Sequence, residues 1–315
     1  MYDFKLDKIN EEIKEKGYQK VLLQLPEGLK PKAYDIVNSL EAEVFVSGEP
    51  CWGACDLAIN DAKELKVDAI IIFGHAPFIK TDIPIIYAET PYLKDIPNDL
   101  LIKLKEKLQP YNKIGLAASI QHVHQLQNLQ LNKPTLIAPQ SGRNICEGQV
   151  LGCDCSGTKQ IQREVDVILV IGTRFHALGV ALNTSNPVIL LDLYNEEILN
   201  MEEDKNKMLQ KRYAQIEKAK EAKKFAILIS LKPGQKEMQL AKQLQIKNSI
   251  TISITEITPE KLIQFYDIDC FISLACPRLV VEESARFTKP LLNYKEYLVL
   301  TNQLEWNDIL KSGLY

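Results

Sequence analysis

Three cysteines of the chain stand in short motifs whose composition suits metal chemistry. They are Cys55 in GACD, Cys153 in GQVLGCD and Cys276 in ACPR. Each motif follows an apolar run, and the three motifs fall in different thirds of the sequence. Iron–sulfur clusters are normally held by cysteine thiolates. Three thiolates therefore suit a [4Fe–4S] cluster in which one iron lacks a protein ligand and is open to a substrate.

Two other interpretations of these cysteines stay open. Structural zinc prefers four ligands that come as close pairs. Cys51 with Cys55, and Cys153 with Cys155, would make such pairs, although a single intervening residue is poor geometry for the second pair. The cysteines could also be scattered through the chain without a shared role.

The remaining cysteines are predicted not to be ligands. They are Cys51, Cys146, Cys155 and Cys270. Cys270 lies in an apolar run and suits a small buried hydrophobic residue. Cys51 and Cys55 resemble the opening of the CxxxCxxC motif of ordinary radical S-adenosylmethionine enzymes, but Ala58 stands at the third position, so that motif is not completed.

The elements that must position these cysteines recur along the chain. An aspartate opens an apolar run three times, and a proline opens a further apolar run after each, at intervals of about 100 residues. These markers are Asp68, Asp166 and Asp269, followed by Pro84, Pro187 and Pro290. Cys55 precedes Asp68 by the same number of residues as Cys153 precedes Asp166. The third unit has Glu256 at this place and carries Cys276 beyond Asp269 instead.

Each unit alternates short apolar runs with helical patterns, which predicts βαβ units and a parallel sheet. The opening helices are expected near residues 4–15, 97–108 and 202–223, and the first strands near 20–25, 113–118 and 225–230. We therefore expect an α/β fold of three homologous small domains with mainly parallel sheets about a pseudo-threefold axis. The expected boundaries are 1–96, 97–198 and 199–315, and each range holds one of the three cysteines.

Ligands of open α/β sheets bind beyond the carboxyl ends of the strands. The polar motifs fall at predicted strand ends or helix starts, and all four histidines of the chain belong to this set. Cys55 and Cys153 are expected at the start of helices, where the helix dipole would lower the thiol pKa.

The composition of the chain narrows its class. The chain has 315 residues, a net charge of −3 and no block of like charge longer than a few residues. This argues against a nucleic-acid or membrane-surface partner, since either would favour a basic patch. No apolar run approaches the ~20 residues that span a bilayer. The first residues lack an apolar signal core, so the expected location is the cytoplasm, where cysteine clusters bind metal or react more often than they form disulfides.

Taken together, GACD, QHVHQL, GQVLGCD, FHALG and ACPR resemble the archaeal diphthamide-synthesis family, the 2-(3-amino-3-carboxypropyl)histidine synthases. The resemblance covers nearly the whole chain. It implies a homodimer of three-domain chains in which Cys55, Cys153 and Cys276 hold one [4Fe–4S] cluster.

The resemblance also implies the activity, a transferase reaction of noncanonical radical type. S-adenosylmethionine binds the open iron, and an electron from the reduced cluster breaks the bond between sulfur and the methionine γ-carbon. The resulting 3-amino-3-carboxypropyl radical adds to a histidine of translation elongation factor 2, and methylthioadenosine leaves. This is the first step of diphthamide biosynthesis, and it requires an electron donor.

Other residues are candidates for the substrate or S-adenosylmethionine pocket. They are His122, His124, Gln125 and His176. The first three open a predicted helix, which suits binding of a carboxylate or ribose, but they would equally cap the helix. His176 would contact the substrate imidazole or the adenosyl group, or would pack a loop. His75 is expected to be structural.

Two other functions remain as alternatives. A quinolinate synthase-like dehydratase would use the open iron of a [4Fe–4S] cluster as a Lewis acid on a small acid. A non-catalytic metal-bound scaffold in translation would perform no reaction. Cleavage of S-adenosylmethionine to methylthioadenosine separates the first function from both.

Overall fold

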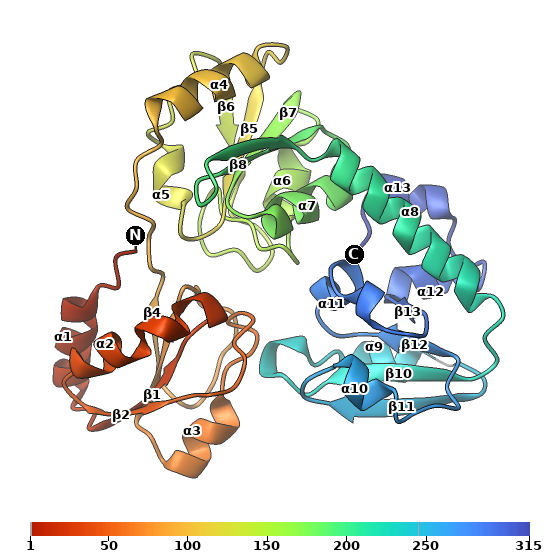
Figure 1. The fold of residues 1–315 in the computed structure, drawn as a ribbon, viewed down its shortest axis with the longest axis horizontal. Coiled ribbons are helices and arrows are strands. Elements are labelled where there is room, and N and C mark those ends of the chain that lie inside the picture. The colour runs from red at the N-terminus through yellow and green to blue at the C-terminus, as the bar shows by residue number, and fades with distance from the viewer. Residues whose placement is uncertain (1, 245) are drawn as a thin grey trace. The chain divides into compact units, whose positions relative to one another are not determined.

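The structure is a computed structural model that describes residues 2–244 and 246–315 (Figure 1). The chain forms two compact units. Unit 1 consists of the chain up to Asp95 together with Ile120–His124 and Lys232–Gly234. Unit 2 consists of Ile96–Ser119, Gln125–Leu231 and Gln235–Tyr315. Cys55 therefore belongs to unit 1, whereas Cys153 and Cys276 belong to unit 2.

Unit 1 contains a parallel sheet with the strand order β2-β1-β3-β4. Its strands are β1 (Lys20–Gln24), β2 (Glu43–Val46), β3 (Ala69–Phe73) and β4 (Ile85–Ala88). Its helices are α1 (Leu6–Lys16), the 3-10 helix η1 (Glu27–Lys32), α2 (Ala33–Asn38) and α3 (Ile59–Leu65). Val21 and Leu23 of β1 pack with Ile13 of α1, whereas Leu22 packs with Ala62 of α3. Because both faces of the sheet are covered by helices, the strands are continuous apolar runs.

Unit 2 contains two sheets. The first has the order β6-β5-β7-β8-β9 and is parallel except for β9, which is antiparallel to β8. Its strands are β5 (Ile114–Ala118), β6 (Thr135–Ile137), β7 (Val167–Ile171), β8 (Val188–Asp192) and β9 (Glu197–Asn200). Its helices are α4 (Asn98–Leu108), α5 (Val123–Leu126), α6 (Ser156–Ile161) and α7 (Arg174–Asn183), although the first residues of α5 lie in unit 1.

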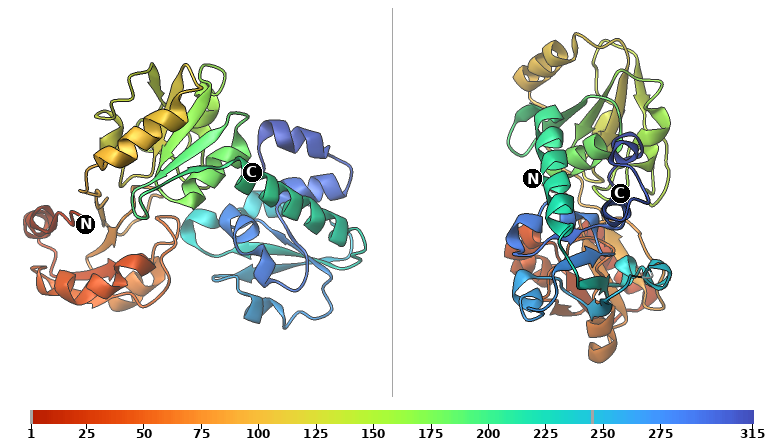
Figure 2. Two further views of the ribbon diagram at one scale, coloured as in Figure 1. Left: turned by 45° about the horizontal axis from the view of Figure 1, so that its top comes forward. Right: turned by 90° about the vertical axis from the view of Figure 1, so that its right-hand side faces the viewer.

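The second sheet of unit 2 is parallel and has the order β11-β10-β12-β13. Its strands are β10 (Phe225–Ser230), β11 (Ser249–Ile254), β12 (Cys270–Ser273) and β13 (Leu291–Leu292). The helices that precede or accompany it are α8 (Glu202–Ala219), η2 (Pro233–Gln235), α9 (Met238–Gln243), α10 (Pro259–Leu262), α11 (Pro277–Val281), η3 (Ser284–Arg286), α12 (Tyr294–Leu300) and α13 (Trp306–Ser312), although the first two residues of η2 lie in unit 1. Figure 2 shows α8 lying along α12, with which it is in contact.

The three sheets share one strand order, in which the first strand lies between the second and the third. This order confirms the predicted α/β class and mainly parallel sheets. The predicted boundaries at residues 96 and 198, and the pseudo-threefold axis, stay predictions. The sheet of unit 1 lies within 1–96 and the second sheet of unit 2 within 199–315, but β9 crosses the predicted boundary at 198. Ile309 and Leu314 from the third range also join the core of the first sheet of unit 2.

The recurring aspartates perform the same task in each sheet. The Oδ2 atom of each accepts two backbone N–H groups at the start of the first strand. The donors are Gln19 and Lys20 for Asp68, Asn112 and Lys113 for Asp166, and Lys223 and Lys224 for Asp269, at 2.7–3.0 Å. These backbone hydrogen bonds lower the pKa of each carboxyl group. The carboxylates thus fasten the third strand of each sheet to the first.

The recurring prolines also have one task. The backbone oxygen of each accepts a hydrogen bond from the third strand of its sheet. The pairs are Ile70 to Pro84, Ile168 to Pro187 and Phe271 to Pro290, at 2.9–3.0 Å. In each sheet the recurring proline therefore marks the place where the fourth strand begins to pair with the third.

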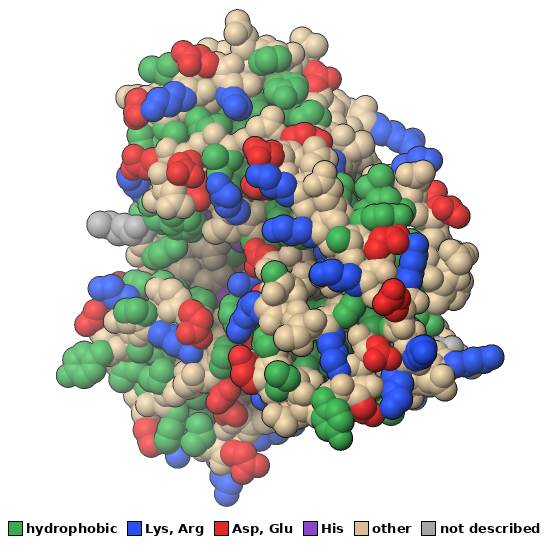
Figure 3. All heavy atoms as spheres, turned by 45° about the vertical axis from the view of Figure 1, so that its right-hand side comes forward, with side chains coloured by type: hydrophobic (Ala, Val, Ile, Leu, Met, Phe, Trp, Pro, Cys, Tyr) green, Lys and Arg blue, Asp and Glu red, His purple; other side chains and the backbone are tan. Residues whose placement is uncertain are grey.

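Several elements differ from the predictions. The helix expected to open with His122, His124 and Gln125 is only the short α5, and the sequence did not predict β9, α12 or α13. On the face shown in Figure 3, side chains of Lys and Arg are interspersed with those of Asp and Glu. Within the described part of the chain, none of the helices is long and apolar enough to cross a membrane.

Candidate metal centre

Burial divides the cysteines into two groups. The buried group consists of Cys51, Cys155 and Cys270, whose exposed fractions are 3%, 4% and 0%. Burial raises the pKa of each of these thiols to about 12. A protonated, buried thiol is a poor metal ligand. These thiols are therefore protonated in the metal-free protein, and the prediction that Cys51 and Cys155 are not ligands stays a prediction.

The partly exposed group contains the three predicted ligands. Its members are Cys55, Cys146, Cys153 and Cys276. Burial alone does not set Cys146 apart from the other three. The Cys146 Sγ atom lies 4.0 Å from the Gln149 side-chain oxygen, in the loop before the Cys153 turn.

Cys55 lies in a turn that Gln24 holds in place. The Asp56 N–H donates to the Gly53 carbonyl oxygen at 2.9 Å. Gln24, which is 1% exposed at the end of β1, donates to the Asp56 carbonyl oxygen (2.7 Å) and accepts from the Ala58 N–H (3.0 Å). A buried amide with both functions satisfied fixes the loop on either side of the turn.

The segment Lys232–Gly234 also supports Cys55 within unit 1. The Lys232 ammonium lies 2.7 Å from the Asp56 carboxylate, and both side chains are largely buried. The Gly234 N–H donates to the Cys55 carbonyl oxygen at 2.8 Å. A Cβ on Gly234 would lie 2.5 Å from the Cys55 Cα, so only glycine allows this approach. In the sequence, only the proline and glycine at 233 and 234 mark this segment, which was not among the predicted site residues.

His75 lies beside the same turn. Its Nδ1 atom is 2.9 Å from the Phe73 carbonyl oxygen, which can only accept, so Nδ1 carries the proton and Nε2 has a lone pair. Burial lowers the pKa of His75 to about 4, so the ring is neutral at pH 7. A Cβ on Gly53 would lie 3.4 Å from the Cys55 Sγ and 4.0 Å from the His75 Nε2. This histidine, expected to be structural, therefore neighbours a predicted ligand.

Cys153 occupies the tip of a two-residue turn. Leu151 and Asp154 exchange backbone hydrogen bonds of 3.0 and 3.1 Å, which leaves Gly152 and Cys153 as the central residues. A Cβ on Gly152 would overlap the ring of Phe175 in α7. The turn thus packs directly on the helix that carries the FHALG motif.

The contact between this turn and α7 requires a second glycine. A Cβ on Gly179 would lie 2.5 Å from the Gly152 carbonyl oxygen and 3.2 Å from its Cα. These are backbone atoms, which cannot move aside as a side chain would. The glycines of GQVLGCD and FHALG therefore allow the two backbones to approach closely.

Asp154 fastens the other side of the Cys153 turn. Its carboxylate accepts from the backbone N–H groups of Arg143 (2.6 Å) and Ser156 (3.0 Å). Asp56 and Asp154 follow equivalent cysteines, but Asp56 pairs with a lysine and Asp154 with backbone N–H groups. The two units therefore share the aspartate after the cysteine, but the aspartate has different hydrogen-bond partners in each unit.

Cys276 is the N-cap residue of α11 and follows β12 by three residues. Pro277 takes the first helical position, which suits its fixed φ. Arg278 forms an ion pair with Glu282, and its guanidinium carbon lies 5.9 Å from the centre of the Phe175 ring. Phe175 therefore contacts both the turn of Cys153 and the residues after Cys276.

The expected helix-start position is wrong for both cysteines for which it was predicted, Cys55 and Cys153. Helix α3 begins at Ile59 and α6 at Ser156, so Cys55 and Cys153 lie in turns before these helices. The prediction came from the number of residues between each cysteine and the following Asp68 or Asp166. This spacing does not reveal how long the turn before the helix is. Of the three predicted ligands, only Cys276 caps a helix.

Tyr315 reaches the same region of unit 2. Its hydroxyl group donates to the Gly152 carbonyl oxygen at 2.6 Å. Burial raises the pKa of Tyr315 well above its usual range, and the charges of Cys155, Cys153 and Cys276 contribute further to this shift. The hydroxyl group therefore stays protonated and remains a hydrogen-bond donor near Cys153 and Cys276. Tyr315 was not among the predicted site residues.

The predicted pocket residues are divided between the units. His122 and His124 belong to unit 1, and Gln125 and His176 to unit 2. His122 is fully buried, with its ring 5.2 Å from that of Tyr92, whereas His124 is exposed and Gln125 half-buried. The Nδ1 atom of His176 lies 2.9 Å from the Thr173 hydroxyl oxygen, in the first turn of α7 beside Phe175. The structure thus brings His176 near the Cys153 turn.

The thiols that the sequence selects fit an iron–sulfur cluster in their chemistry. Each is partly exposed and lies in a turn or cap whose backbone is fixed by hydrogen bonds. Among the described residues, no group of three or more His, Cys, Asp and Glu side chains is arranged to hold a metal ion. The complete ligand set draws on both units and stays a prediction.

Comparisons with known proteins agree with the motifs. The family model of diphthamide synthesis proteins matches residues 25–310. A 2-(3-amino-3-carboxypropyl)histidine synthase of Pyrococcus horikoshii is 31% identical over 98% of this chain and 94% of its own length. One from Methanocaldococcus jannaschii is 30% identical, with 97% and 92% covered. A crystal structure of Dph2 from Pyrococcus horikoshii with a 4Fe-4S cluster superimposes with a TM-score of 0.88 at 30% identity, covering 97% of this chain and 93% of that chain.

Proposed function

Because the chain belongs to the diphthamide synthesis family, we propose that it transfers the 3-amino-3-carboxypropyl group of S-adenosylmethionine to a histidine of translation elongation factor 2. The observation that carries the proposal is the family match, which spans the motifs of all three predicted cysteine ligands. The relatives that match over nearly their full length are named for this transferase activity.

We propose that Cys55, Cys153 and Cys276 hold one [4Fe–4S] cluster, one from each of the domains 1–96, 97–198 and 199–315. The Pyrococcus horikoshii structure, which contains a 4Fe-4S cluster, supports the presence of the cluster. When bound, the cluster supplies the electron that breaks the bond between sulfur and the γ-carbon of S-adenosylmethionine, whose products are methylthioadenosine and the 3-amino-3-carboxypropyl radical.

The residues of the chain position and shield this chemistry. Gln24 and Gly234 hold the Cys55 turn, and the Lys232 ammonium offsets the charge of Asp56 directly beside it. Phe175 covers the Cys153 turn with an apolar ring. Fixed ligands and excluded water favour a reaction in which a reactive group must meet one target carbon.

Two histidines of the chain suit different tasks. His75 is neutral and presents the unprotonated Nε2 near Cys55, so it can accept a hydrogen bond without adding charge. His176 and Thr173 offer polar atoms at the start of α7, where the carboxylate or the adenosyl group of S-adenosylmethionine would bind. His122, His124 and Gln125 remain further candidates for that pocket.

We also propose the partners, the oligomeric state and the location of the protein. The protein substrate is elongation factor 2, an electron donor reduces the cluster, and the enzyme acts as a homodimer in the cytoplasm. Membranes and nucleic acid have no direct part.

Anaerobic purification followed by iron and sulfide analysis tests the proposal. We expect about four iron and four sulfide per chain, and methylthioadenosine formation when the reduced protein meets S-adenosylmethionine. Elongation factor 2 then gains the transferred group. Cys276→Ala abolishes cluster binding and cleavage, whereas Cys270→Ala, a buried cysteine of the same sheet, retains both.

Other results contradict the proposal. Zinc without sulfide under anaerobic conditions excludes the radical reaction. A [4Fe–4S] cluster that converts no S-adenosylmethionine returns the chain to the quinolinate synthase-like or scaffold alternatives. Equal behaviour of the two cysteine variants shows that the ligand assignment is wrong.

A further inference from the structure

Residues 313–315 pack against the first sheet of unit 2, although they follow the second. Leu314 is fully buried, and its backbone N–H donates to a carbonyl oxygen of α7 at 3.2 Å. The Tyr315 hydroxyl group donates to the Gly152 carbonyl oxygen at 2.6 Å. That oxygen belongs to the planar peptide group that contains the Cys153 nitrogen, so this bond restrains the orientation of the cysteine itself.

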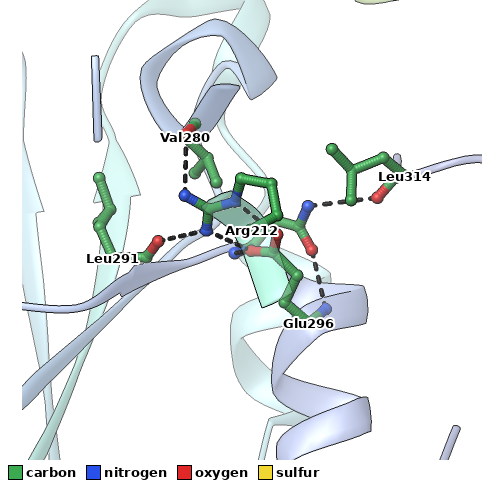
Figure 4. A network of polar contacts seen from close by, with 6 residues as sticks. Arg212, Val280, Leu291, Glu296 and Leu314 are labelled. Carbon is green, nitrogen blue, oxygen red and sulfur yellow. Dashed lines mark hydrogen bonds and ion pairs between the residues drawn. The ribbon is translucent and has the colours of Figure 1, made fainter. Parts of the chain in front are cut away.

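A buried ion pair lies on the other side of this segment (Figure 4). Arg212 of α8 and Glu296 of α12 have fully buried side chains and form two parallel N–H···O bonds of 2.6 Å. Arg212 also donates to the backbone oxygens of Val280 (3.0 Å) and Leu291 (2.6 Å). Val280 lies in α11, the helix that Cys276 caps. The guanidinium group therefore fixes the backbone of that helix.

Hydrogen bonds continue from the ion pair to Leu314. The Glu296 carboxylate accepts from the Asn293 backbone N–H at 2.8 Å, and the Asn293 side-chain oxygen accepts from the Glu296 N–H at 2.9 Å. The Asn293 side-chain amide donates to the Leu314 carbonyl oxygen at 3.2 Å. An unbroken series of contacts thus runs from the helix of Cys276 to the residue before Tyr315.

We propose that Tyr315 is a positioning residue for Cys153, and that the network of Arg212, Glu296 and Asn293 couples this contact to the helix of Cys276. The inference rests on the proposed function, in which both cysteines hold the cluster. Groups that contact a ligand from behind orient it and tune the metal, and their loss is costly even when the ligand remains. Phe175, Gly179 and Asp154 hold the sides of the turn, whereas the Tyr315 hydroxyl group bonds to the peptide group of Cys153 itself and so bears directly on where the tip points.

The hydroxyl group can be separated from the ring by one substitution. Tyr315→Phe keeps the ring that packs in the core and removes only the donor to Gly152. If Tyr315 merely fills space, this variant behaves as the parent protein. If the hydroxyl group positions the turn, Cys153 changes its behaviour while the fold is retained.

The test measures alkylation of each thiol in the full-length protein after chelators have removed iron. Iodoacetamide labelling followed by mass spectrometry gives separate rates for Cys153, Cys276 and Cys55. We expect Tyr315→Phe to raise the Cys153 rate about five-fold, which corresponds to the ~1 kcal/mol of one hydrogen bond. The Cys55 rate in unit 1 stays unchanged. Tyr213→Phe, which alters an exposed tyrosine of the same unit, leaves all three rates unchanged.

Two further readouts test the coupling and the link to the metal. Asn293→Ala, which removes the donor to Leu314, should raise the Cys153 rate in the same direction. In reconstituted Tyr315→Phe with full iron content, the electron paramagnetic resonance signal of the reduced cluster should shift from that of the parent protein. A Cys153 rate in Tyr315→Phe equal to that of the parent overturns the positioning role, and an unchanged rate in Asn293→Ala overturns the coupling.

The outcomes separate this inference from the proposed function. An altered Cys153 rate in a protein that assembles no cluster supports the positioning contact and refutes the function. An unaltered rate in a protein that assembles the cluster and cleaves S-adenosylmethionine refutes the positioning contact alone. A uniform rise at all three thiols shows general destabilisation, which also counts against positioning.

Discussion

The buried ion pair of Arg212 and Glu296 yields a prediction about stability. Arg212→Met removes the charge that neutralises Glu296, whose side chain is fully buried. Breaking a buried pair by removing one partner costs about 3–5 kcal/mol, because the remaining charge is uncompensated. The carbonyl oxygens of Val280 and Leu291 also lose their donor. The free energy of unfolding of a domain is about 5–15 kcal/mol, so we expect this variant to lose about 4 kcal/mol, a large part of it.

A second substitution should recover part of this loss. In the double variant with Arg212→Met and Glu296→Met, no charge is left in the core, and the free energy of unfolding should exceed that of the Arg212→Met variant. Replacing a whole buried pair by apolar side chains is often neutral. The recovery is incomplete here, because the two backbone oxygens and the Asn293 N–H still lack partners. The losses of unfolding free energy in the two single variants should therefore add up to several kcal/mol more than the loss in the double variant.

Urea unfolding followed by circular dichroism measures these free energies. Lys211→Met is the matched control, since it makes the same substitution at the exposed neighbour in α8, and should change the value by about 0.5 kcal/mol or less. A loss below about 1 kcal/mol for Arg212→Met would refute the reasoning. A double variant as unstable as the sum of the single variants would also refute it, since the two side chains would then be energetically independent.

Three further predictions concern backbone approach and charge. Gly179→Ala puts a Cβ 2.5 Å from a backbone oxygen of the Cys153 turn, so it should lower the free energy of unfolding by about 1–3 kcal/mol and lower the iron content per chain. Thermal melting and iron analysis measure these two effects. Gly48→Ala, which has open space around it, should change neither the stability nor the iron content. Asp166→Asn should lower the thermal midpoint at pH 7. Because folding lowers the pKa of this carboxyl group, its stabilisation is present above the unfolded pKa and is lost as the pH falls. The difference from the parent protein should therefore narrow below a pH of about 4, and a constant difference contradicts the assignment. Lys232→Met leaves the largely buried Asp56 without its cation, so it should destabilise the protein by about 3 kcal/mol in urea unfolding, and a neutral outcome would show that the pair is solvated.

Much of the fold was predictable because its signals are local. The first strands near residues 20, 113 and 225 are short apolar runs that follow amphipathic helices, and the structure confirms all three. The family named from the motifs is also confirmed by the comparisons. The recurring aspartates were visible because they bond to the chain about 50 residues earlier in each sheet, which makes them a constant part of the unit.

Elements with non-local causes escaped the sequence analysis. Helix α13 and residues 313–315 are stabilised by packing into a core whose strands lie more than 100 residues earlier, and no periodicity announces such a contact. The buried Arg212 is a similar case. Within its own helix it stands among charged residues and looks exposed, and only the distant Glu296 makes its burial favourable.

The supports of the cysteines were the least predictable part of the site, and the repeat itself explains why. Cys55 and Cys153 occupy equivalent places before equivalent aspartates, which suggests equivalent surroundings. Yet the Cys55 turn is held by Gln24 and by the distant Lys232–Gly234, whereas the Cys153 turn is held by α7 and Tyr315. A repeat keeps what each unit needs in order to fold alone, such as the bond from its aspartate to its first strand. Contacts with distant segments differ from unit to unit, so the repeat could select the cysteines and could not identify the residues that aim them.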